Sequence, residues 1–253
     1  MALSGRVALV TGSSRGVGRA IALALAADGA DVVVNYSRDV ESANEVAAAI
    51  TSMDRRAEVV RANVSSLEDL EAMVATVEER LGPISILIHN AGVASRGRAV
   101  INTSPDEVAA LIAIHAVAAH HLCRLVLPRM RSCSRGDVVM ISSAFTKINA
   151  ANGAPYNMAK AALEALAFTL AKEEVDYGIH VNVVAPGLVD TEMGRRLVKS
   201  TSGEDDIRAL DAQSPFGHVC RPEDVASVVS YLCSENAGYL TGQRIYVDGG
   251  ANG

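Results

Sequence analysis

A tyrosine and a lysine one helical turn apart are the residues best suited to acid and base chemistry. Tyr156 and Lys160 follow Pro155 in a stretch that predicts a helix, so their side chains lie on one helix face. A phenol has a pKa of about 10, and a neighbouring ammonium group favours its ionised form. Ser143 ends an apolar run and could donate a hydrogen bond to a carbonyl oxygen where negative charge develops. These side chains predict proton transfer at a carbonyl or alcohol.

A glycine-rich turn near the amino terminus indicates a site for a phosphate group. The apolar run 7–10 passes into an amphipathic run through Thr11-Gly12-Ser13-Ser14-Arg15-Gly16-Val17-Gly18. Glycine lets a ligand lie against the main chain, and the amide groups and dipole at the start of a helix favour an anion. Because the turn joins the first predicted strand to the first predicted helix, a dinucleotide site is favoured over an ordinary tight turn.

Alternating strand and helix patterns must position these groups. Strands are predicted at 6–11, 31–35, 57–62, 84–89, 137–142, 179–184 and 243–247, and helices at 17–28, 39–52, 66–81, 105–131, 155–176 and 222–234. Several strand runs are rich in Val and Ile without polar alternation, which is typical of parallel strands covered on both faces. No stretch resembles a linker or a repeat. We expect an α/β fold, a single-domain Rossmann fold over residues 1–253 with a doubly wound, seven-stranded parallel sheet flanked by helices.

Composition and charge exclude several classes of protein. The 253 residues are 49% hydrophobic and 21% charged, with a formal net charge of −6, which excludes a disordered chain and argues against nucleic-acid binding. Four cysteines lack zinc-site or Cys-x-x-Cys spacing, so reduced thiols in a cytoplasmic protein and no metal are expected. A strand begins within about six residues of the start, so no signal peptide fits. No uncharged apolar run approaches the roughly 18 residues that span a membrane.

The end of the second predicted strand indicates which dinucleotide is bound. An NAD site usually has a carboxylate there for the ribose 2′-hydroxyl, whereas this chain has Asn35-Tyr36-Ser37-Arg38, with Asp39 only afterwards. Arg15 and Arg38 could converge on a 2′-phosphate. We therefore expect NADP(H), with NAD less favoured, and with Asn35, Ser37 and both arginines among the cofactor-binding residues. Two solvated surface arginines are the alternative.

Six motifs in order resemble the short-chain dehydrogenase/reductase family over the full length of the chain. They are Thr11-Gly12-x-x-x-Gly16-x-Gly18, Asn90-Ala91-Gly92, Ser143, Tyr156-x-x-x-Lys160, Pro186-Gly187-x-x-x-Thr191 and Asp248-Gly249-Gly250. Among the members, the chain looks most like 3-oxoacyl-acyl-carrier-protein reductases and bacterial carbonyl reductases.

The resemblance implies a role for each matching residue. Tyr156 would protonate the carbonyl oxygen, Lys160 would hold the nicotinamide ribose and lower the pKa of Tyr156, and Ser143 would polarise the carbonyl. The implied cofactor contacts are Gly12, Ser14, Arg15, Gly16, Val17 and Gly18 at the phosphates, Asn63 and Val64 at adenine, Asn90, Ala91 and Gly92 at the ribose and nicotinamide, and Pro186, Gly187, Val189 and Thr191 at the carboxamide. A homotetramer and a mobile substrate lid at about 191–218, with Met193 and Leu197 as candidate contacts, are also implied.

The chain departs from the family pattern at several positions. His115 stands where the family usually has an Asn that supports a water chain to the lysine. A histidine can donate and accept, so a relay could survive; a histidine packed at a subunit contact, or a weakened enzyme, is the alternative. His89 and Phe145 alter the pocket wall. Tyr177 replaces a residue that is often basic in acyl-carrier reductases, which weakens the case for an acidic carrier protein as partner, although Arg129, Arg131 and Arg135 could form a basic patch.

Three functions remain open at this point. The first is an NADPH-dependent reductase that converts a ketone, either a 3-oxoacyl thioester or another small carbonyl compound, to an alcohol. The second is an NAD(P)-linked alcohol or sugar dehydrogenase that works in the oxidative direction. The third is a cofactor-binding regulator with weak catalysis, suggested by His115; the presence of Ser143, Tyr156 and Lys160 argues against it.

Overall fold

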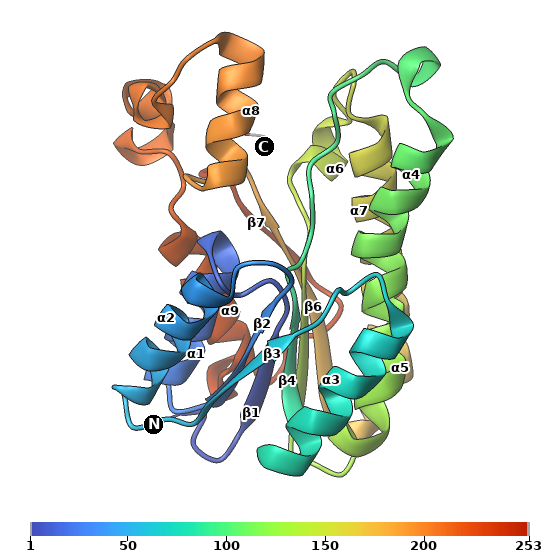
Figure 1. Ribbon diagram of the computed structural model, residues 1–253, viewed down its shortest axis with the longest axis vertical. Coiled ribbons are helices and arrows are strands. Elements are labelled where there is room, and N and C mark those ends of the chain that lie inside the picture. Colours follow the sequence, from blue (N-terminus) through green and yellow to red (C-terminus); the bar gives the residue numbers. More distant parts are fainter. Residues whose placement is uncertain (1, 252–253) are drawn as a thin grey trace.

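Seven parallel strands run through the centre of the molecule in the order β3-β2-β1-β4-β5-β6-β7 (Figure 1). The computed structural model describes residues 2–251. The strands are β1 (Val7–Val10), β2 (Asp31–Tyr36), β3 (Ala57–Arg61), β4 (Ile84–His89), β5 (Gly136–Ile141), β6 (Ile179–Pro186) and β7 (Arg244–Val247). Every predicted strand is confirmed, with ends shifted by at most two residues.

The strand order explains where the functional groups must gather. The sheet grows outward in both directions from the neighbours β1 and β4, so the helices after these two strands lie on opposite faces. At such a point the loops at the carboxyl ends of the strands separate and leave a crevice, which is where open α/β sheets bind ligands. The glycine turn follows β1, and Asn90 follows β4.

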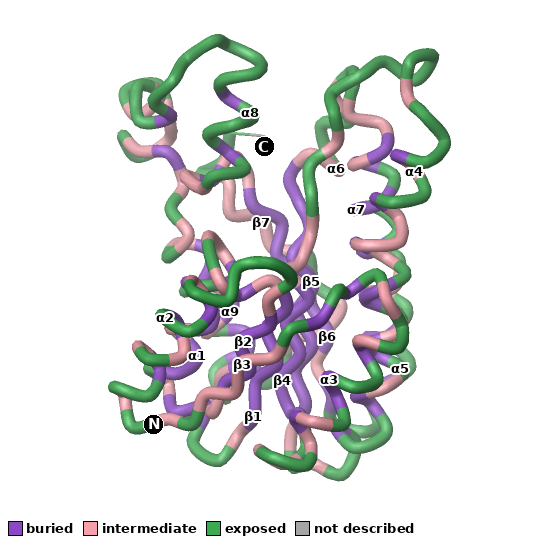
Figure 2. Tube along the Cα trace, viewed as in Figure 1, coloured by how far each residue is buried: buried purple, intermediate pink, exposed green. Residues whose placement is uncertain are grey.

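Helices cover both faces of the sheet and form two apolar cores. α1 (Gly16–Ala27), α2 (Val40–Thr51) and α9 (Pro222–Cys233) pack on one face, and α3 (Leu67–Arg80), α5 (Ala118–Met130) and α7 (Ala154–Glu173) pack on the other. Alternation along β1 illustrates the division, because Val7 and Leu9 enter one core while Ala8 and Val10 enter the other. Figure 2 shows that the buried residues concentrate in the strands and the inner helix faces.

The predicted helix at 105–131 is interrupted at a residue of interest. It consists of α4 (Pro105–Ile112), a π-helical turn at Ala113–Val117 and α5. The wider turn contains His115, which is 1% exposed. Single π-helical turns occur often at functional sites, because the extra residue re-aims a side chain and frees a backbone carbonyl.

The same helical stretch has the length and hydropathy of a membrane-spanning helix, which was not expected from the sequence. Pro105–Met130 is 26 residues long with a mean hydropathy of 1.7 in its most apolar window, which is enough by length and composition to cross a bilayer. Half of that window is buried inside the protein, and α5 packs on β4 and α3. The core helix of a soluble α/β protein has these same properties.

The region 191–218 holds helices that the sequence analysis did not place. Thr191 is the N-cap of α8 (Glu192–Ser202), and its hydroxyl accepts a hydrogen bond from the Gly194 amide at 3.1 Å. Short 3-10 helices follow at Ile207–Gln213 and Pro215–Gly217. Only a small cluster of Val198, Ile207 and Val219 supports this excursion, and most of its surface is exposed (Figure 2). A short helix, α6 (Phe145–Ile148), was also not predicted.

Candidate active site

The glycine turn after β1 is held open by contacts that leave no room for side chains. A Cβ at Gly18 would lie 2.3 Å from the Gly12 carbonyl oxygen and 2.5 Å from Asn90 Nδ2. Asn90 Nδ2 donates to the carbonyl oxygens of Thr11 at 2.9 Å and Gly12 at 3.1 Å. Gly12 itself has φ +63°, a conformation that favours glycine. The turn therefore keeps the cradle that a pyrophosphate requires.

Asn35 supports this turn from beneath and does not face a ligand. It is 2% exposed, and its Oδ1 accepts a hydrogen bond from the Gly12 amide at 3.0 Å. Its Nδ2 lies 3.2 Å from the Ala62 carbonyl oxygen. The prediction that Asn35 binds the cofactor is thus wrong for its side chain, because the backbone of the protein already uses its polar atoms.

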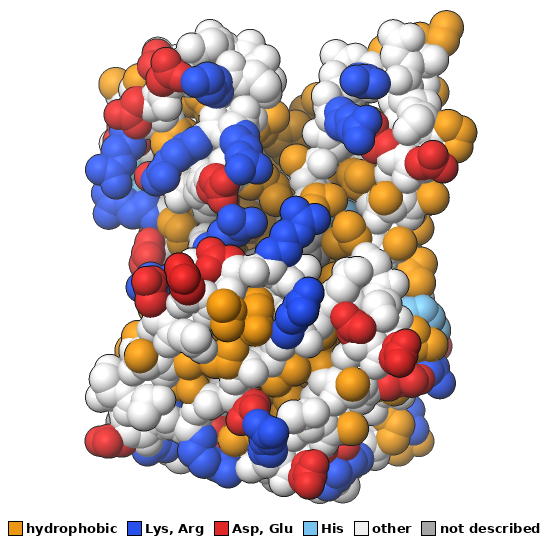
Figure 3. All heavy atoms as spheres, in the orientation of Figure 1, with side chains coloured by type: hydrophobic (Ala, Val, Ile, Leu, Met, Phe, Trp, Pro, Cys, Tyr) orange, Lys and Arg blue, Asp and Glu red, His pale blue; other side chains and the backbone are white. Residues whose placement is uncertain are grey.

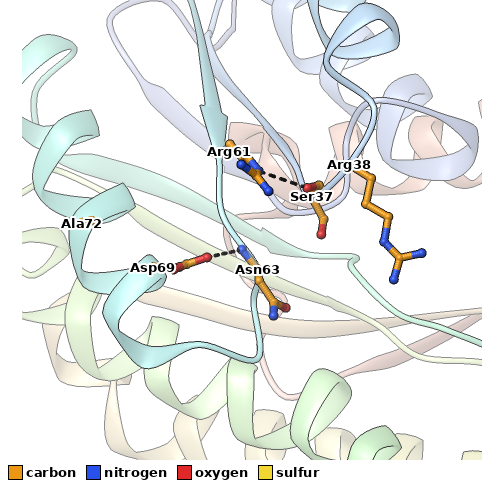
Figure 4. A pocket seen from close by; sticks show the side chains of 6 residues that line it. All are labelled: Ser37, Arg38, Arg61, Asn63, Asp69 and Ala72. Carbon is orange, nitrogen blue, oxygen red and sulfur yellow. Dashed lines mark hydrogen bonds between the residues drawn. The ribbon is translucent and has the colours of Figure 1, made fainter.

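A cavity of 570 Å³ opens beside the end of β2 (Figure 4). It is lined by Ser37, Arg38, Arg61, Asn63, Asp69 and Ala72. The nearest carboxylate in sequence, Asp39, is the N-cap of α2 and accepts from the Ser42 amide at 3.0 Å and the Ser42 hydroxyl at 2.7 Å. These bonds hold the pKa of Asp39 below its usual value. The cavity therefore has two arginines and one carboxylate, Asp69, whose Oδ2 accepts a hydrogen bond from the Asn63 amide at 2.8 Å, while Asp39 is engaged as a helix cap.

Arg15 and Arg38, which were expected to converge on a 2′-phosphate, make different contacts in the structure. Arg38 lines the cavity, whereas Arg15 pairs with Glu192 at the start of α8, with Nη1 and Oε2 2.8 Å apart. The second cation at the cavity is Arg61, whose Nε lies 3.4 Å from the Ser37 carbonyl oxygen. Arg61 was not among the residues predicted from the sequence. It ends β3 and pairs in register with Tyr36 at the end of β2, so both strand ends reach the same edge of the sheet. Its place at the end of a predicted strand could have indicated it.

Other expected cofactor contacts divide into surface and core positions. Ser14, Val17 and Asn63 keep exposed surface, as do Ala91, Gly92, Gly187 and Thr191. Val64 and Val189 are 7% and 8% exposed and pack in the core, so their side chains serve the fold. Pro186 is also buried, at the end of β6. Gly16 lies against the start of the 191–218 region, because a Cβ there would meet Thr191 Cγ2 at 3.3 Å.

The structure brings Ser143, Tyr156 and Lys160 together at the carboxyl edge of the sheet. Ser143 follows β5, and Tyr156 and Lys160 lie one turn apart on α7. The Lys160 ammonium donates to the Ile141 carbonyl oxygen at 2.7 Å and lies 5.7 Å from the centre of the Tyr156 ring. Lys160 is 4% exposed and Ser143 6% exposed, so the cluster is largely shielded from water.

Burial governs the ionisation of this cluster. It raises the pKa of Tyr156, and a hydrogen bond with Ser143 acts in the opposite direction. The sequence analysis assigned that lowering effect to Lys160; here Ser143 supplies it. Burial also lowers the pKa of Lys160 to about 7, although Glu164 one turn further along α7 raises it. A lysine near neutrality can shuttle a proton as well as carry charge.

His115 lies beside Tyr156. The two rings form an edge-to-face pair with centroids 5.5 Å apart. His115 Nε2 is 2.9 Å from the Val93 carbonyl oxygen, while the buried Nδ1 has no hydrogen-bond partner among the described residues. Burial and the charge of Lys160 lower the pKa of His115 to about 2, so the ring is neutral. A Cβ at Gly92 would lie 2.2 Å from its Cε1, so this glycine makes room for the ring.

His89 joins the glycine turn to the π-helical turn. Its Nδ1 lies 3.4 Å from Thr11 Oγ1, and its Nε2 lies 3.3 Å from the Ile114 carbonyl oxygen. Burial lowers its pKa to about 4, which leaves the ring neutral. Since the Ile114 carbonyl can only accept, His89 Nε2 carries the proton in this arrangement. His89 is buried, so it shapes the site from behind rather than forming its surface.

The surface of the molecule is hollowed between two of its parts. Figure 3 shows a depression between the part of the molecule with α8 and the part with α4 and α6, with lysine and arginine side chains gathered along it. Met193 and Leu197 of α8 are 42% and 37% exposed, as contacts to an apolar ligand would need to be. The catalytic candidates, the glycine turn and the arginine-lined cavity all lie at this carboxyl edge of the sheet.

Comparisons with known proteins agree with the fold and with the motifs. The family model described as enoyl-(acyl carrier protein) reductase matches residues 12–252. A 3-oxoacyl-[acyl-carrier-protein] reductase, FabG, of Pseudomonas aeruginosa is 34% identical, covering 99% of this chain and 98% of its own. Tetrahydroxynaphthalene reductase of Pyricularia oryzae is 35% identical, covering 98% of this chain and 90% of its own. The structure of the angucycline C-6 ketoreductase LanV with bound NADP has a TM-score of 0.88 and 33% identity, covering 98% of this chain and 96% of its own.

The chain therefore belongs to the short-chain dehydrogenase/reductase family. It is an oxidoreductase that acts on a carbonyl or the corresponding alcohol with a nicotinamide dinucleotide.

Proposed function

We propose that this enzyme is an NADPH-dependent reductase that converts a ketone, a 3-oxoacyl thioester or another carbonyl compound, to an alcohol. The observation that carries the proposal is the shielded cluster of Ser143, Tyr156 and Lys160 at the carboxyl edge of the sheet. The similarity to FabG and to ketoreductases supports the reductive direction. An alcohol or sugar dehydrogenase would use the same groups in reverse.

The residues fit a dinucleotide with a 2′-phosphate. The glycine turn offers a cradle that a Cβ would fill, and Arg38 and Arg61 line the adjoining cavity. The engagement of Asp39 as a helix cap removes the carboxylate that would hold a free 2′-hydroxyl. We assign the pyrophosphate to the turn at 12–18 and the 2′-phosphate to the cavity. When bound, the reduced nicotinamide supplies a hydride to the carbonyl carbon.

The side chains supply the proton and the orientation. Tyr156, kept protonated by burial, donates its hydroxyl proton to the carbonyl oxygen as negative charge develops there. Ser143 donates a hydrogen bond to the same oxygen and fixes its position. Lys160 then returns a proton to the tyrosine, which its pKa of about 7 permits at neutral pH. The neutral His115, with Nδ1 free of protein partners, passes protons toward Lys160 through water.

Arg38 and Arg61 give a direct test of cofactor choice. Arg38→Ala and Arg61→Ala should each raise the KM for NADPH roughly tenfold, because a hydrogen bond to a charged group contributes ~1.5–3 kcal/mol. The KM for NADH should change by less than about twofold, since NADH lacks the phosphate. Arg129→Ala near the end of α5 is the control, because Arg129 is exposed and pairs with Glu78, near the end of α3 that is remote from Asp69 and Ala72. Equal losses with both cofactors would contradict the assignment of the 2′-phosphate.

His115 can be tested as a relay. His115→Leu should lower kcat about tenfold without raising the KM for NADPH, which is less than the roughly 10²–10⁴-fold contribution of a direct proton donor because His115 acts through water. His115→Asn should keep most of the activity, since an amide also donates and accepts. Steady-state rates between pH 5 and 10 provide the measurement. If His115→Leu has the wild-type kcat and pH profile, the histidine only fills space beside Gly92.

We also propose an assembly and a location for this enzyme, and consider an acyl carrier protein as its partner. Exposed apolar side chains on the helical layer, Val117 at 42% and Met158 at 51%, suit a contact between subunits, and we propose a homotetramer. An acyl carrier protein is a weaker proposal, because Arg129, Arg131 and Arg135 are paired with Glu78, Glu174 and Asp137. We also propose a cytoplasmic location. Analytical ultracentrifugation of the purified protein would test the assembly.

A further inference from the structure

A buried carboxylate on α7 links three parts of the active site. Glu164 is 5% exposed, and its Oε1 accepts a hydrogen bond from the Ser142 hydroxyl at 2.6 Å. Thr146 Oγ1 lies 2.9 Å from the same oxygen. Arg244 of β7 donates to the other oxygen, Oε2, at 2.6 Å. Burying a carboxylate costs free energy unless hydrogen bonds and a counter-charge engage its oxygens. Ser142, Thr146 and Arg244 provide these contacts to Glu164.

The two hydroxyl groups flank the serine that faces the substrate. Ser142 precedes Ser143 in the turn after β5, and Thr146 lies in α6, three residues beyond the serine. The Thr146 hydroxyl is also 2.9 Å from the Ser143 carbonyl oxygen, so its one proton is shared between that oxygen and Glu164. Beyond these contacts, the turn is held by backbone bonds of Ser142 and Ala144 to β6 at 2.8 Å. Glu164 thus joins this turn to α7, together with the hydrogen bond between Tyr156 and Ser143 and that of Lys160 to the Ile141 carbonyl oxygen.

We propose that Glu164 is a positioning residue for the reduction: its carboxylate fixes the Ser143 turn against the helix that carries Tyr156 and Lys160, with Arg244 as its counterion. The inference rests on the proposed reductase function. It goes beyond that function because Glu164 touches none of the reacting atoms. Its effect is transmitted through Ser142 and Thr146 to the serine, and through the helix to the lysine one turn away.

The charge of Glu164 also acts on Lys160. It raises the pKa of the lysine against the larger effect of burial. The other ionisable groups near the lysine are Tyr156 on α7, His89 at the end of β4 and His115 in the π-helical turn, and both histidines are neutral. The Tyr246 ring lies 5.1 Å from the Arg244 guanidinium and 5.5 Å from the Lys147 ammonium. Removing the charge of Glu164 therefore lowers the pKa of Lys160.

Glu164→Gln is the first test, because it preserves size and one acceptor but removes the charge. We expect kcat for carbonyl reduction to fall about tenfold, since small displacements of a positioned group cost one to two orders of magnitude. The KM for NADPH should stay within about twofold. The alkaline limb of the kcat profile should move to lower pH, because Lys160 loses its proton earlier. Glu173→Gln, an exposed carboxylate on the same helix, should leave all three quantities unchanged.

Two further variants separate positioning from stability. Ser142→Ala and Thr146→Val keep the ion pair with Arg244 and should each lower kcat about threefold, with a smaller loss of melting temperature than in Glu164→Gln, because only one hydrogen bond to the carboxylate is removed. The double variant Glu164→Gln, Arg244→Gln removes both charges, so it should recover the melting temperature lost in Glu164→Gln but not the position of the alkaline limb. Recovery of kcat and the pH profile together with the melting temperature would overturn the proposal in favour of a structural ion pair.

The outcomes distinguish this inference from the function on which it rests. Wild-type turnover that is lost in Tyr156→Phe but unchanged in Glu164→Gln overturns the role of Glu164 alone. A wild-type protein that binds NADPH and reduces no carbonyl compound overturns the reductase function, and the inference with it. Wild-type turnover with a slower, acid-shifted Glu164→Gln enzyme supports both.

Discussion

Tyr156→Phe should reduce the rate of carbonyl reduction by about 10³-fold or more, which is the largest single effect that we expect. General acid catalysis contributes roughly 10²–10⁴-fold, and no other described hydroxyl shares the position of this phenol beside Ser143 and Lys160. The loss should fall on kcat, because Phe keeps the ring that packs edge-to-face on His115. The measurement is single-turnover oxidation of NADPH, followed by absorbance with a ketone that the wild-type enzyme reduces.

Binding experiments provide the control for this prediction. The affinity of Tyr156→Phe for NADPH, measured by fluorescence titration, should stay within about threefold of the wild-type value, since one hydrogen bond contributes ~0.5–1.5 kcal/mol. Tyr177→Phe is a matched variant, because Tyr177 lies under the Arg131 guanidinium at 3.9 Å on the surface. It should reduce ketones at the wild-type rate. A Tyr156→Phe enzyme with near-wild-type kcat would refute the assigned proton donor.

Gly18→Ala should strongly weaken dinucleotide binding, which is the second large effect that we expect. The new Cβ would lie 2.3 Å from the Gly12 carbonyl oxygen and 2.5 Å from Asn90 Nδ2, and neither group can move without opening the turn. Because Asn90 Nδ2 holds the Thr11 and Gly12 carbonyls, the displacement would spread through the cradle. We expect the Kd for NADPH to rise by about 100-fold and the free energy of unfolding to fall by ~1–3 kcal/mol, as overpacking does in well-packed regions.

A glycine elsewhere makes a suitable comparison. At Gly238 the nearest atom to an added Cβ is the Glu235 carbonyl oxygen at 3.1 Å, far from the glycine turn, so Gly238→Ala should bind NADPH as the wild type does. Calorimetry and thermal unfolding of the two variants would separate the effects. If Gly18→Ala bound NADPH with unchanged Kd, the close approach of the turn to Asn90 would have no bearing on the cofactor.

The sequence determined the architecture and the identity of the chemical groups. Val- and Ile-rich runs such as 84–89 form parallel strands because only such strands are buried on both faces, and spacing alone puts Tyr156 and Lys160 on one helix face. The motifs, in order, identified the family. What is local in sequence, a strand, a turn or a pair four residues apart, could be predicted because its geometry is set by the backbone.

The tertiary structure decided which side chains each polar group meets. Asn35 and Arg38 are three residues apart, yet Asn35, inside β2, is sealed beneath the glycine turn, whereas Arg38 lies two residues beyond the end of the strand and lines the cavity. Arg15 pairs with Glu192, 177 positions away, and Glu164 meets Arg244, 80 positions away. The π-helical turn at His115 likewise has no local signal. Such contacts depend on how helices and strands pack across the sheet, so the sequence supplied the functional groups and the packing selected their partners.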